Sequence, residues 1–219
     1  MPRAGSSSAS ATEAERTHRL RYHCACSGAS DVRRRLLEGA ARVLDEEGPT
    51  ALSARRLATE AGTSTMAVYT HFGGMGAVVD AVATEGFQRL IDHVDTVEIS
   101  DDPVADLLAM AVAYRQNALE NQHLYAVMFG AVSVRGLGGH GPDLEVAYTA
   151  FRQLADAIER AMRAGALRSD DPSAVAAQFW SAIHGYTMLE LAGMDQVVAD
   201  PEHEVLWRLL SNLLSALAP

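Results

Sequence analysis

The sequence predicts an all-α protein in which a small N-terminal helix-turn-helix unit precedes a larger helical region. Apolar residues recur at helical spacing through most of the chain, and no segment alternates as a half-buried strand would. A glycine also separates two short helical patterns within residues 52–72. With 48% hydrophobic residues among 219, the chain has enough apolar surface for one large core or two small ones.

Residues 1–29 are rich in Ser, Ala and Gly and then in Arg and His, and this composition predicts a disordered basic arm. Two roles are open for its arginines, namely contact with DNA or solvation alone. The side chains of the arm that could act as soft metal ligands are His18, His23, Cys24 and Cys26. Because no second paired motif accompanies them, we expect no metal, no cofactor and no structural disulfide.

The first helical pattern covers residues 31–47 and is amphipathic. Its apolar side consists of Val32, Leu36, Leu37, Ala40, Val43 and Leu44. The sequence Glu46-Glu47-Gly48-Pro49 ends the helix. The apolar side requires partners, which the next two helical patterns can supply.

Residues 52–72 predict two short helices joined by a tight turn. Ser53 can cap the first of them, because its hydroxyl can accept a hydrogen bond from a free amide of the first turn. The apolar face of this helix comprises Leu57, Ala58 and Ala61. Gly62 ends it, since glycine readily adopts the left-handed conformation that a sharp turn requires.

The second short helix begins near Ser64 or Thr65, either of which can cap it. Val68 and Phe72 point inward from this helix. The pattern is that of a helix-turn-helix, in which the second helix enters the major groove of DNA. With the helix at 31–47 it makes a minimal three-helix DNA-binding domain with its own core.

Helical patterns continue beyond the loop Gly73-Gly74-Met75-Gly76. We expect helices at about 77–93, 103–121, 122–129, 142–164, 172–192 and 202–217. Pro103 suits a first helical turn, and Gly165 suits the position just after a helix. The glycine-rich residues 131–141 predict a flexible loop.

Charge is distributed unevenly along the chain. The net charge is −10, but residues 1–75 carry +2 and residues 76–219 carry −12. Binding to nucleic acid requires only a local positive face, so the overall negative charge does not exclude it. All 18 basic residues are arginine, whose guanidinium fork can bind phosphate and guanine at two points.

The sequence also lacks the features of a membrane span or a secretory signal. Its apolar runs fall short of the ~18 consecutive residues that a span requires. The N-terminal region has no continuous apolar stretch of the kind found in signal peptides. We therefore expect a cytoplasmic protein without membrane contacts.

Four features occur together in residues 31–90: Leu36-Leu37-x-x-Ala40, Gly48, the Ala58-x-x-x-Gly62 turn and the segment Val68-Tyr69-Thr70-His71-Phe72. They resemble the N-terminal domain of the TetR/AcrR family of bacterial transcription regulators. The Tyr-x-His-Phe ending is fairly specific to that family. The resemblance implies a DNA-binding regulator built as a two-part helical protein.

Further motifs lie downstream: Tyr114-Arg115-x-x-Ala118-Leu119-Glu120-Asn121, Tyr125, Met128-Phe129-Gly130, Trp180-Ser181-Ala182-Ile183-His184-Gly185 and Leu189-Glu190-Leu191-Ala192-Gly193. They are similar to a C-terminal regulatory domain of Trp-His-Gly type found in one branch of the family. The two resemblances together cover most of residues 31–195.

The family resemblance implies a recognition helix at about Ser64–His71. The residues expected to bind double-stranded DNA are Arg33, Arg34, Ser53, Arg55, Ser64, Thr65, Met66, Tyr69 and His71. Thr65 and Met66 would lie closest to base edges. Tyr69 and His71 would contact phosphates, which set the register of the complex.

Some of these expected contacts have alternatives. The arginine run at 33–35 is also typical of a solvated helix face. The Tyr69 ring can pack under the helix and reach DNA with its hydroxyl alone. Many family members carry a phosphate-binding lysine just after the Tyr-x-His-Phe ending, where this chain has Gly73-Gly74-Met75-Gly76. We expect one fewer phosphate contact per subunit, or compensation by the arm, and a salt dependence shallower by ~0.9 log unit per missing phosphate contact.

The resemblance also implies a pocket for a largely apolar small-molecule effector among the C-terminal helices. Its candidate residues are Met110, Tyr114, Tyr125, Phe129, Phe151, Trp180, His184 and Met188. Trp180 and His184 share a helix face, and His184 could be the polar anchor of an apolar site. Such a stripe is equally typical of an ordinary core in which His184 satisfies a backbone carbonyl.

The last two long helices carry more apolar surface than one core requires. The residues concerned are Phe179, Trp180, Ile183, Met188 and Leu191 on one helix and Val205, Leu206, Leu209, Leu210, Leu213 and Leu214 on the other. Packing against a symmetry mate would form a four-helix interface. In the resembling family these helices build the dimer, and Glu190 could cap or pair at that interface.

These observations divide the chain into an arm at 1–29, a helix-turn-helix domain at 30–76 and a regulatory and dimerisation domain at 77–219. The leading hypothesis is a homodimeric repressor that binds a palindromic operator and is released by a small molecule. The alternative is a constitutive or architectural DNA-binding protein whose C-terminal region only dimerises.

A hypothesis of another class is a small helical enzyme that uses His184 with Glu190 or Asp156. The sequence has no nucleophile motif, no metal-binding spacing and no phosphate loop that would support it. We therefore expect no catalytic residues.

Overall fold

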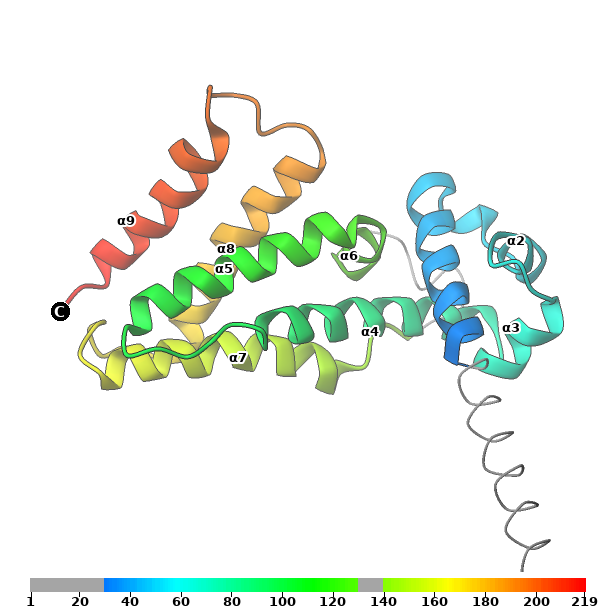
Figure 1. Cartoon of the computed structure of the whole chain (residues 1–219), viewed down its shortest axis with the longest axis horizontal. Helices are drawn as coiled ribbons and strands as arrows, with labels where there is room; N and C mark the ends of the chain where they lie inside the picture. The colour runs from blue at the N-terminus through cyan, green and yellow to red at the C-terminus, as the bar shows by residue number, and fades with distance from the viewer. Residues whose placement is uncertain (1–29, 130–139) are drawn as a thin grey trace, which may run out of the picture.

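The computed structural model describes residues 30–129 and 140–219 (Figure 1). Within these ranges every regular element is a helix, which confirms the predicted all-α class. The predicted basic arm, with its possible metal ligands, and most of the predicted glycine-rich loop lie outside the described residues. No helix in the described ranges is long and apolar enough to cross a bilayer.

Residues 30–74, here called the head, contain a helix over 30–47, the short turn η1 (Pro49–Ala51), and the helices α2 (Ala54–Glu60) and α3 (Thr65–Phe72). Ser53 caps α2 by accepting a hydrogen bond from the backbone N–H of Arg56. Ser64, rather than Thr65, caps α3. Gly62 has a φ of 61°, so the turn between the two helices uses the left-handed conformation.

Residues 75–219, here called the body, contain α4 (Met75–Val94), α5 (Pro103–Glu120), α6 (Gln122–Phe129), α7 (Leu144–Arg163), α8 (Pro172–Leu191), η3 (Glu202–Trp207) and α9 (Arg208–Ala216). α4 runs from the head into the body, where α5 lies on one side and α7 on the other (Figure 1). The predicted helix at 202–217 differs in its first part, because η3 is π-helical. Apolar periodicity does not distinguish this wider turn from an α turn.

Two hydrophobic clusters make up the core. The head cluster joins the helix at 30–47, α2 and α3 to the first half of α4 and to Leu124 and Val127 of α6. The body cluster includes Leu90 of α4 and Tyr125 of α6 together with residues of α5, α7, α8 and α9. Both α4 and α6 therefore contribute to both clusters.

Candidate DNA-binding face and ligand cavity

The outer face of α3 presents several of the residues expected to bind DNA. Met66 is 71% exposed and Tyr69 is 51% exposed, whereas Val68 is fully buried and anchors the helix in the head. The exposed face comprises Ser64, Thr65, Met66 and Tyr69, with His71 half-buried at its edge. To a DNA groove, this face offers one flexible apolar side chain, one aromatic ring and three hydroxyls, those of Ser64, Thr65 and Tyr69.

Most arginines of the head are held by carboxylates of the head itself. The arginines in ion pairs of 2.5–3.4 Å are Arg34, Arg35, Arg42 and Arg56, and their partners are Asp31, Glu38, Glu47 and Glu60. Of the six arginines among the described residues of the head, only Arg33 and Arg55 form no ion pair. The Arg33 guanidinium lies 5.4 Å from the centroid of the Phe72 ring, a cation–π contact. Arg55 is exposed at the first turn of α2.

A cavity of about 460 Å³ lies in the body, mainly between α4, α5, α7 and α8. The predicted pocket residues that line it are Met110, Tyr114, Phe129, Phe151 and Trp180. The walls that α4 and α7 contribute, which include Phe87, Leu90 and Tyr148, were not predicted from the sequence. The apolar face of α7 recurs at helical spacing, so a signal existed, but it did not distinguish cavity wall from core.

Four side chains form a hydrogen-bonded cluster at the cavity, here called the aromatic relay: Tyr114, Tyr125, Trp180 and His184. The Tyr125 hydroxyl lies 2.7 Å from His184 Nδ1 and 2.9 Å from the Tyr114 hydroxyl. Tyr114 is also 3.0 Å from His184 Nδ1. Trp180 Nε1–H donates to the Tyr114 hydroxyl at 3.3 Å. Tyr125 and His184 do not line the cavity themselves, but Tyr125 and His184 hydrogen-bond to Tyr114, which lines it together with Trp180.

Burial favours the uncharged forms of Tyr114, Tyr125 and His184. It raises the pKa of Tyr114 to about 12 and also raises the pKa of Tyr125. It lowers the pKa of His184 from its ordinary value of 6.5. His184 Nδ1 bonds to hydroxyls, and not to a backbone carbonyl, which was the alternative role open to it from the sequence.

Two further residues of α8 lie away from the cavity. Met188, one helical turn beyond His184, does not line it. Glu190 forms a bidentate ion pair with Arg115 of α5, at 2.5 and 2.8 Å, which joins two helices of one subunit. No hydrogen bond between described residues joins His184 to Glu190 or Asp156, so the acid–base pairs of the enzyme hypothesis are not formed.

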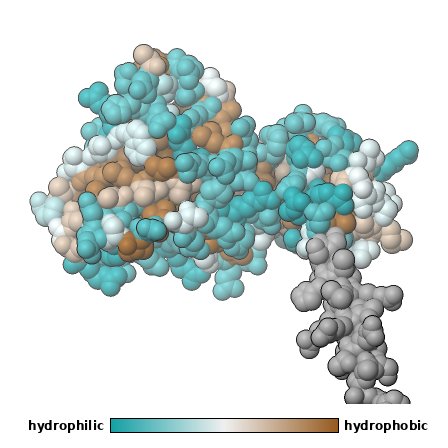
Figure 2. All heavy atoms as spheres, viewed as in Figure 1, coloured by the Kyte–Doolittle hydropathy of each residue, from teal (hydrophilic) through white to brown (hydrophobic). Residues whose placement is uncertain are grey.

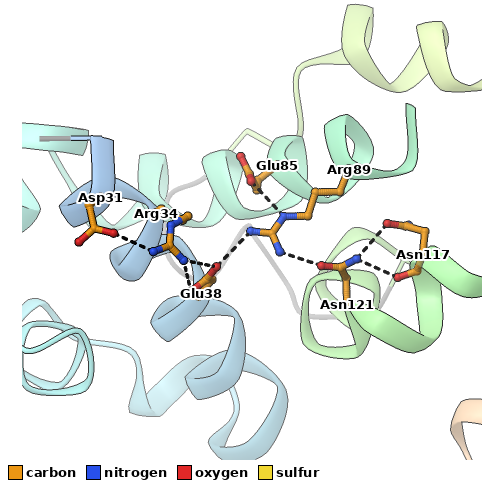
Figure 3. A network of polar contacts seen from close by, with 7 residues as sticks. All are labelled: Asp31, Arg34, Glu38, Glu85, Arg89, Asn117 and Asn121. Carbon is orange, nitrogen blue, oxygen red and sulfur yellow. Dashed lines mark hydrogen bonds and ion pairs between the residues drawn. The ribbon is translucent and has the colours of Figure 1, made fainter. Parts of the chain in front are cut away.

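Figure 3 shows a polar network that joins the head to the body. Arg89 of α4 contacts Glu85 on its own helix at 3.1 Å and Asn121 between α5 and α6 at 2.7 Å. It also reaches Glu38 on the helix at 30–47, at 3.4 Å. This network was not predicted from the sequence, because partners 51 residues apart leave no local pattern.

Two other contacts lie near this network: one joins the head to the body, and the other lies within the body. His123 of α6 lies 2.6 Å from Asp45 at the end of the helix at 30–47. The Asp80 carboxylate of α4 accepts hydrogen bonds from the backbone N–H groups of His140 and Gly141, at 2.8–3.0 Å. α4 is therefore tied both to the head and to the chain that leads into α7.

Apolar side chains are exposed on α8 and α9. The exposed fraction is 37% for Trp180, 49% for Leu189 and 38% for Leu209. Figure 2 shows apolar surface gathered over the body, whereas the head is mostly hydrophilic in this view. Four of the residues predicted at the dimer interface are buried within the subunit because they complete its own core, namely Phe179, Ile183, Leu206 and Leu210.

Comparisons with known proteins agree with this two-part architecture. Residues 36–82 match the model "Bacterial regulatory proteins, tetR family", and residues 107–213 match "Tetracyclin repressor-like, C-terminal domain". The chain is 32% identical over 173 residues to an uncharacterized HTH-type transcriptional regulator of Mycobacterium tuberculosis, which covers 77% of this chain and 74% of that protein.

Solved structures share the fold. A Rhodococcus sp. RHA1 protein of unknown function is 29% identical, with a TM-score of 0.69 over 86% of this chain and 96% of that one. The TetR family regulator PfmR of Thermus thermophilus is 20% identical, with a TM-score of 0.64 over 83% of this chain and 97% of that one. At that identity, PfmR supports the fold alone.

Proposed function

Because this chain belongs to the TetR family of helix-turn-helix transcriptional regulators, we propose that it is a homodimeric repressor that releases a palindromic operator when a small molecule fills the cavity. The observation that carries this proposal is the cavity of about 460 Å³ in the body. Its wall includes α4, the helix that also enters the core of the head. Its volume falls within the range of small-molecule sites.

The proposed DNA contacts come from α3 and from the two helices before it. Thr65 and Met66 would meet base edges, while Ser53, Tyr69 and His71 would bind phosphates. The cations proposed for the flanking backbone are Arg33, Arg34 and Arg55. Arg34 would have to exchange its carboxylate partners for phosphate, so Arg33 and Arg55 should contribute more.

Release of the operator would follow from movement of α4. This helix lines the cavity with Phe87, Leu90 and Val94, and its first turns belong to the core of the head. A ligand that separates α4 from α7 would shift the head, to which α4 is tied through Arg89 and Glu38. Two recognition helices must lie ~34–36 Å apart to read successive major grooves. Coupling of this kind is worth ~1–3 kcal/mol in typical allosteric proteins.

We further propose that α8 and α9 form the dimer through the side chains they expose. The functional division would fall near residue 76, between a DNA-binding domain at 30–76 and a regulatory domain at 77–219. The Trp-His-Gly type of regulatory domain is the branch that we propose, because Trp180 lines the cavity and the His184 ring packs against it, with 5.8 Å between the ring centroids. The alternative is a constitutive DNA-binding protein. An interior filled by side chains would support that alternative better than the cavity does.

The test is binding of the purified protein to the DNA upstream of its own gene, measured by fluorescence anisotropy at two salt concentrations. Tyr69→Ala should weaken specific binding, because it removes an exposed phosphate contact on α3. Ile99→Ala, which shortens a 68% exposed side chain outside the head, is the matched control. Equal affinity for scrambled DNA, or no loss in Tyr69→Ala, would contradict the proposed interface.

A further inference from the structure

The cavity wall is almost free of polar groups. Among the described residues that line it, none carries a charge, and only Tyr114, Tyr148 and Trp180 have a nitrogen or oxygen in the side chain. Transferring an ion into such surroundings removes its hydration without supplying a partner, which is strongly unfavourable. The wall therefore selects against carboxylates, phosphates and ammonium groups.

The polar groups of the wall lie at different depths. Tyr148 is 62% exposed, so this residue lies where the cavity wall meets solvent. Tyr114 is only 7% exposed and belongs to the aromatic relay. The inner part of the cavity thus offers one main point for hydrogen bonding, the Tyr114 hydroxyl, to which Trp180 Nε1–H donates.

The aromatic relay can present this hydroxyl as either donor or acceptor. When His184 Nδ1 is unprotonated, Tyr125 donates to it, Tyr114 donates to Tyr125, and the Tyr114 oxygen keeps a lone pair for a ligand donor. When the proton is on Nδ1, His184 donates to Tyr125 and Tyr125 donates to Tyr114. The Tyr114 hydrogen is then free for a ligand acceptor. Both arrangements are uncharged, because only the tautomer of the imidazole differs.

We propose that the effector is an uncharged, mainly apolar molecule carrying one hydroxyl or carbonyl group, and that this group hydrogen-bonds to the Tyr114 hydroxyl. This inference rests on the proposed function, since it takes the cavity as the effector site. The residues of α7 that line the cavity extend from Leu144 to Leu154, which is about 15 Å along the helix axis. A molecule of that length would place its apolar part along α7 and its polar group at the aromatic relay.

The experiment compares four probes with the same kind of hydrocarbon tail and different heads: decanol, methyl octyl ketone, decanoate and decylammonium. Emission of Trp180 reports binding, because this indole lines the cavity. The other tryptophan, Trp207, is not among the cavity residues and is replaced in the reporter protein Trp207→Phe. Decanol and the ketone should bind at least tenfold more tightly than the two ions. Tighter or equal binding of either ion, or no binding of any probe, would overturn the inference.

A variant locates the polar contact. Tyr114→Phe should weaken binding of decanol and of the ketone by about two- to tenfold, the usual effect of removing one hydrogen bond. Tyr186→Phe, which removes the hydroxyl of a buried tyrosine that does not line the cavity, is the matched control. Equal loss of affinity in both variants would contradict the assignment to Tyr114. The ranking of the four probes in the reporter protein remains a valid test if Tyr114→Phe folds poorly.

Adding operator DNA to the same titrations separates this inference from the proposed function. If the neutral probes bind and the operator stays bound, the ligand class stands and ligand-induced release fails. If decanoate alone binds and releases the operator, release stands and the uncharged class fails.

Discussion

The head and the body bury different kinds of apolar side chain. Every buried residue of the head cluster is Leu, Val or Ala. The body cluster adds Met110, Phe179 and three tyrosines, and it borders a cavity of about 460 Å³. Small aliphatic side chains fill the space between short helices closely, whereas large rings around a cavity pack less completely. The contrast indicates a head that is closely packed around α3 and a body that keeps unfilled space between its helices.

Truncation of one leucine in each region should give the largest difference. Leu57 is fully buried in the head, so Leu57→Ala should lower the free energy of unfolding by about 3–5 kcal/mol. Leu107 is 3% exposed but borders the cavity, and Leu107→Ala should cost about 2–3 kcal/mol because this side chain is less closely surrounded. Urea unfolding at one fixed protein concentration measures both values. A larger destabilisation by Leu107→Ala would refute the contrast in packing.

Removing a contact between the two regions should lower the free energy of unfolding by less than truncating a leucine in either core. Arg89→Met keeps the aliphatic stem but removes the contacts with Asn121 and Glu38, and it should cost about 1–2 kcal/mol of unfolding free energy. Operator affinity should also fall, because the head would be less firmly oriented on the body. Arg152→Met, at an exposed position of α7, is the matched control. If both variants behave alike in unfolding and in DNA binding, the network does not orient the head.

The charges of the head should differ from one another in their effect on DNA binding. Arg55→Ala should reduce the slope of log affinity against log salt by about 0.9 for each phosphate that the protein no longer neutralises. Arg34→Ala should reduce it less, because Asp31 and Glu38 already neutralise that guanidinium. Arg163→Ala, at a 70% exposed side chain of α7, should leave the slope unchanged. Equal slopes for Arg34→Ala and Arg55→Ala would show that ion pairs within the head do not reduce the contribution of an arginine to DNA binding.

The smallest expected effect is a dependence of stability on pH that arises in the body. Burial lowers the pKa of His184 in the folded state, so the unfolded chain binds this proton first as the pH falls through 6.5. The contribution of neutral His184 to the free energy of unfolding should therefore be fully present above that pH. Below it, the free energy of unfolding should fall by at most about 1.4 kcal/mol per pH unit. His184→Gln, which does not titrate, should show a smaller decline between pH 7.5 and 5.5, measured by urea unfolding. If the free energy of unfolding of His184→Gln falls as steeply as that of the unsubstituted protein, other titratable groups cause the decline.

The sequence was most informative where neighbouring residues decide the structure. Ser53 as a cap and Gly62 at the turn follow from local backbone requirements, and the burial of Val68 follows from helical spacing. For the second short helix these requirements left two candidate caps, of which Ser64 is the one used. The predicted ranges of the helices also agree with the structure to within two residues at each end, apart from the π-helical start at Glu202–Trp207.

The site was harder to predict, because it depends on which helix faces meet. Aromatic residues of α5, α6 and α8 could be proposed, but nothing local indicated that Tyr114, Tyr125 and His184 would share hydrogen bonds. Met188 has the same spacing from His184 as Trp180 does, yet only Trp180 lines the cavity. The pairing of Arg89 with Glu38 depends on the docking of the head against α4, which helical periodicity does not encode.

The sharing of α4 and α6 between the two clusters has a consequence for how the molecule melts. Val78 and Leu90 of α4 lie in different clusters, as do Leu124 and Tyr125 of α6. Neither cluster can lose its structure without exposing apolar surface of the other, so heating should give one calorimetric transition for head and body together. A molecule that fills the cavity would then raise the melting temperature of the whole chain and slow protease cleavage within α2 and α3, far from where it binds.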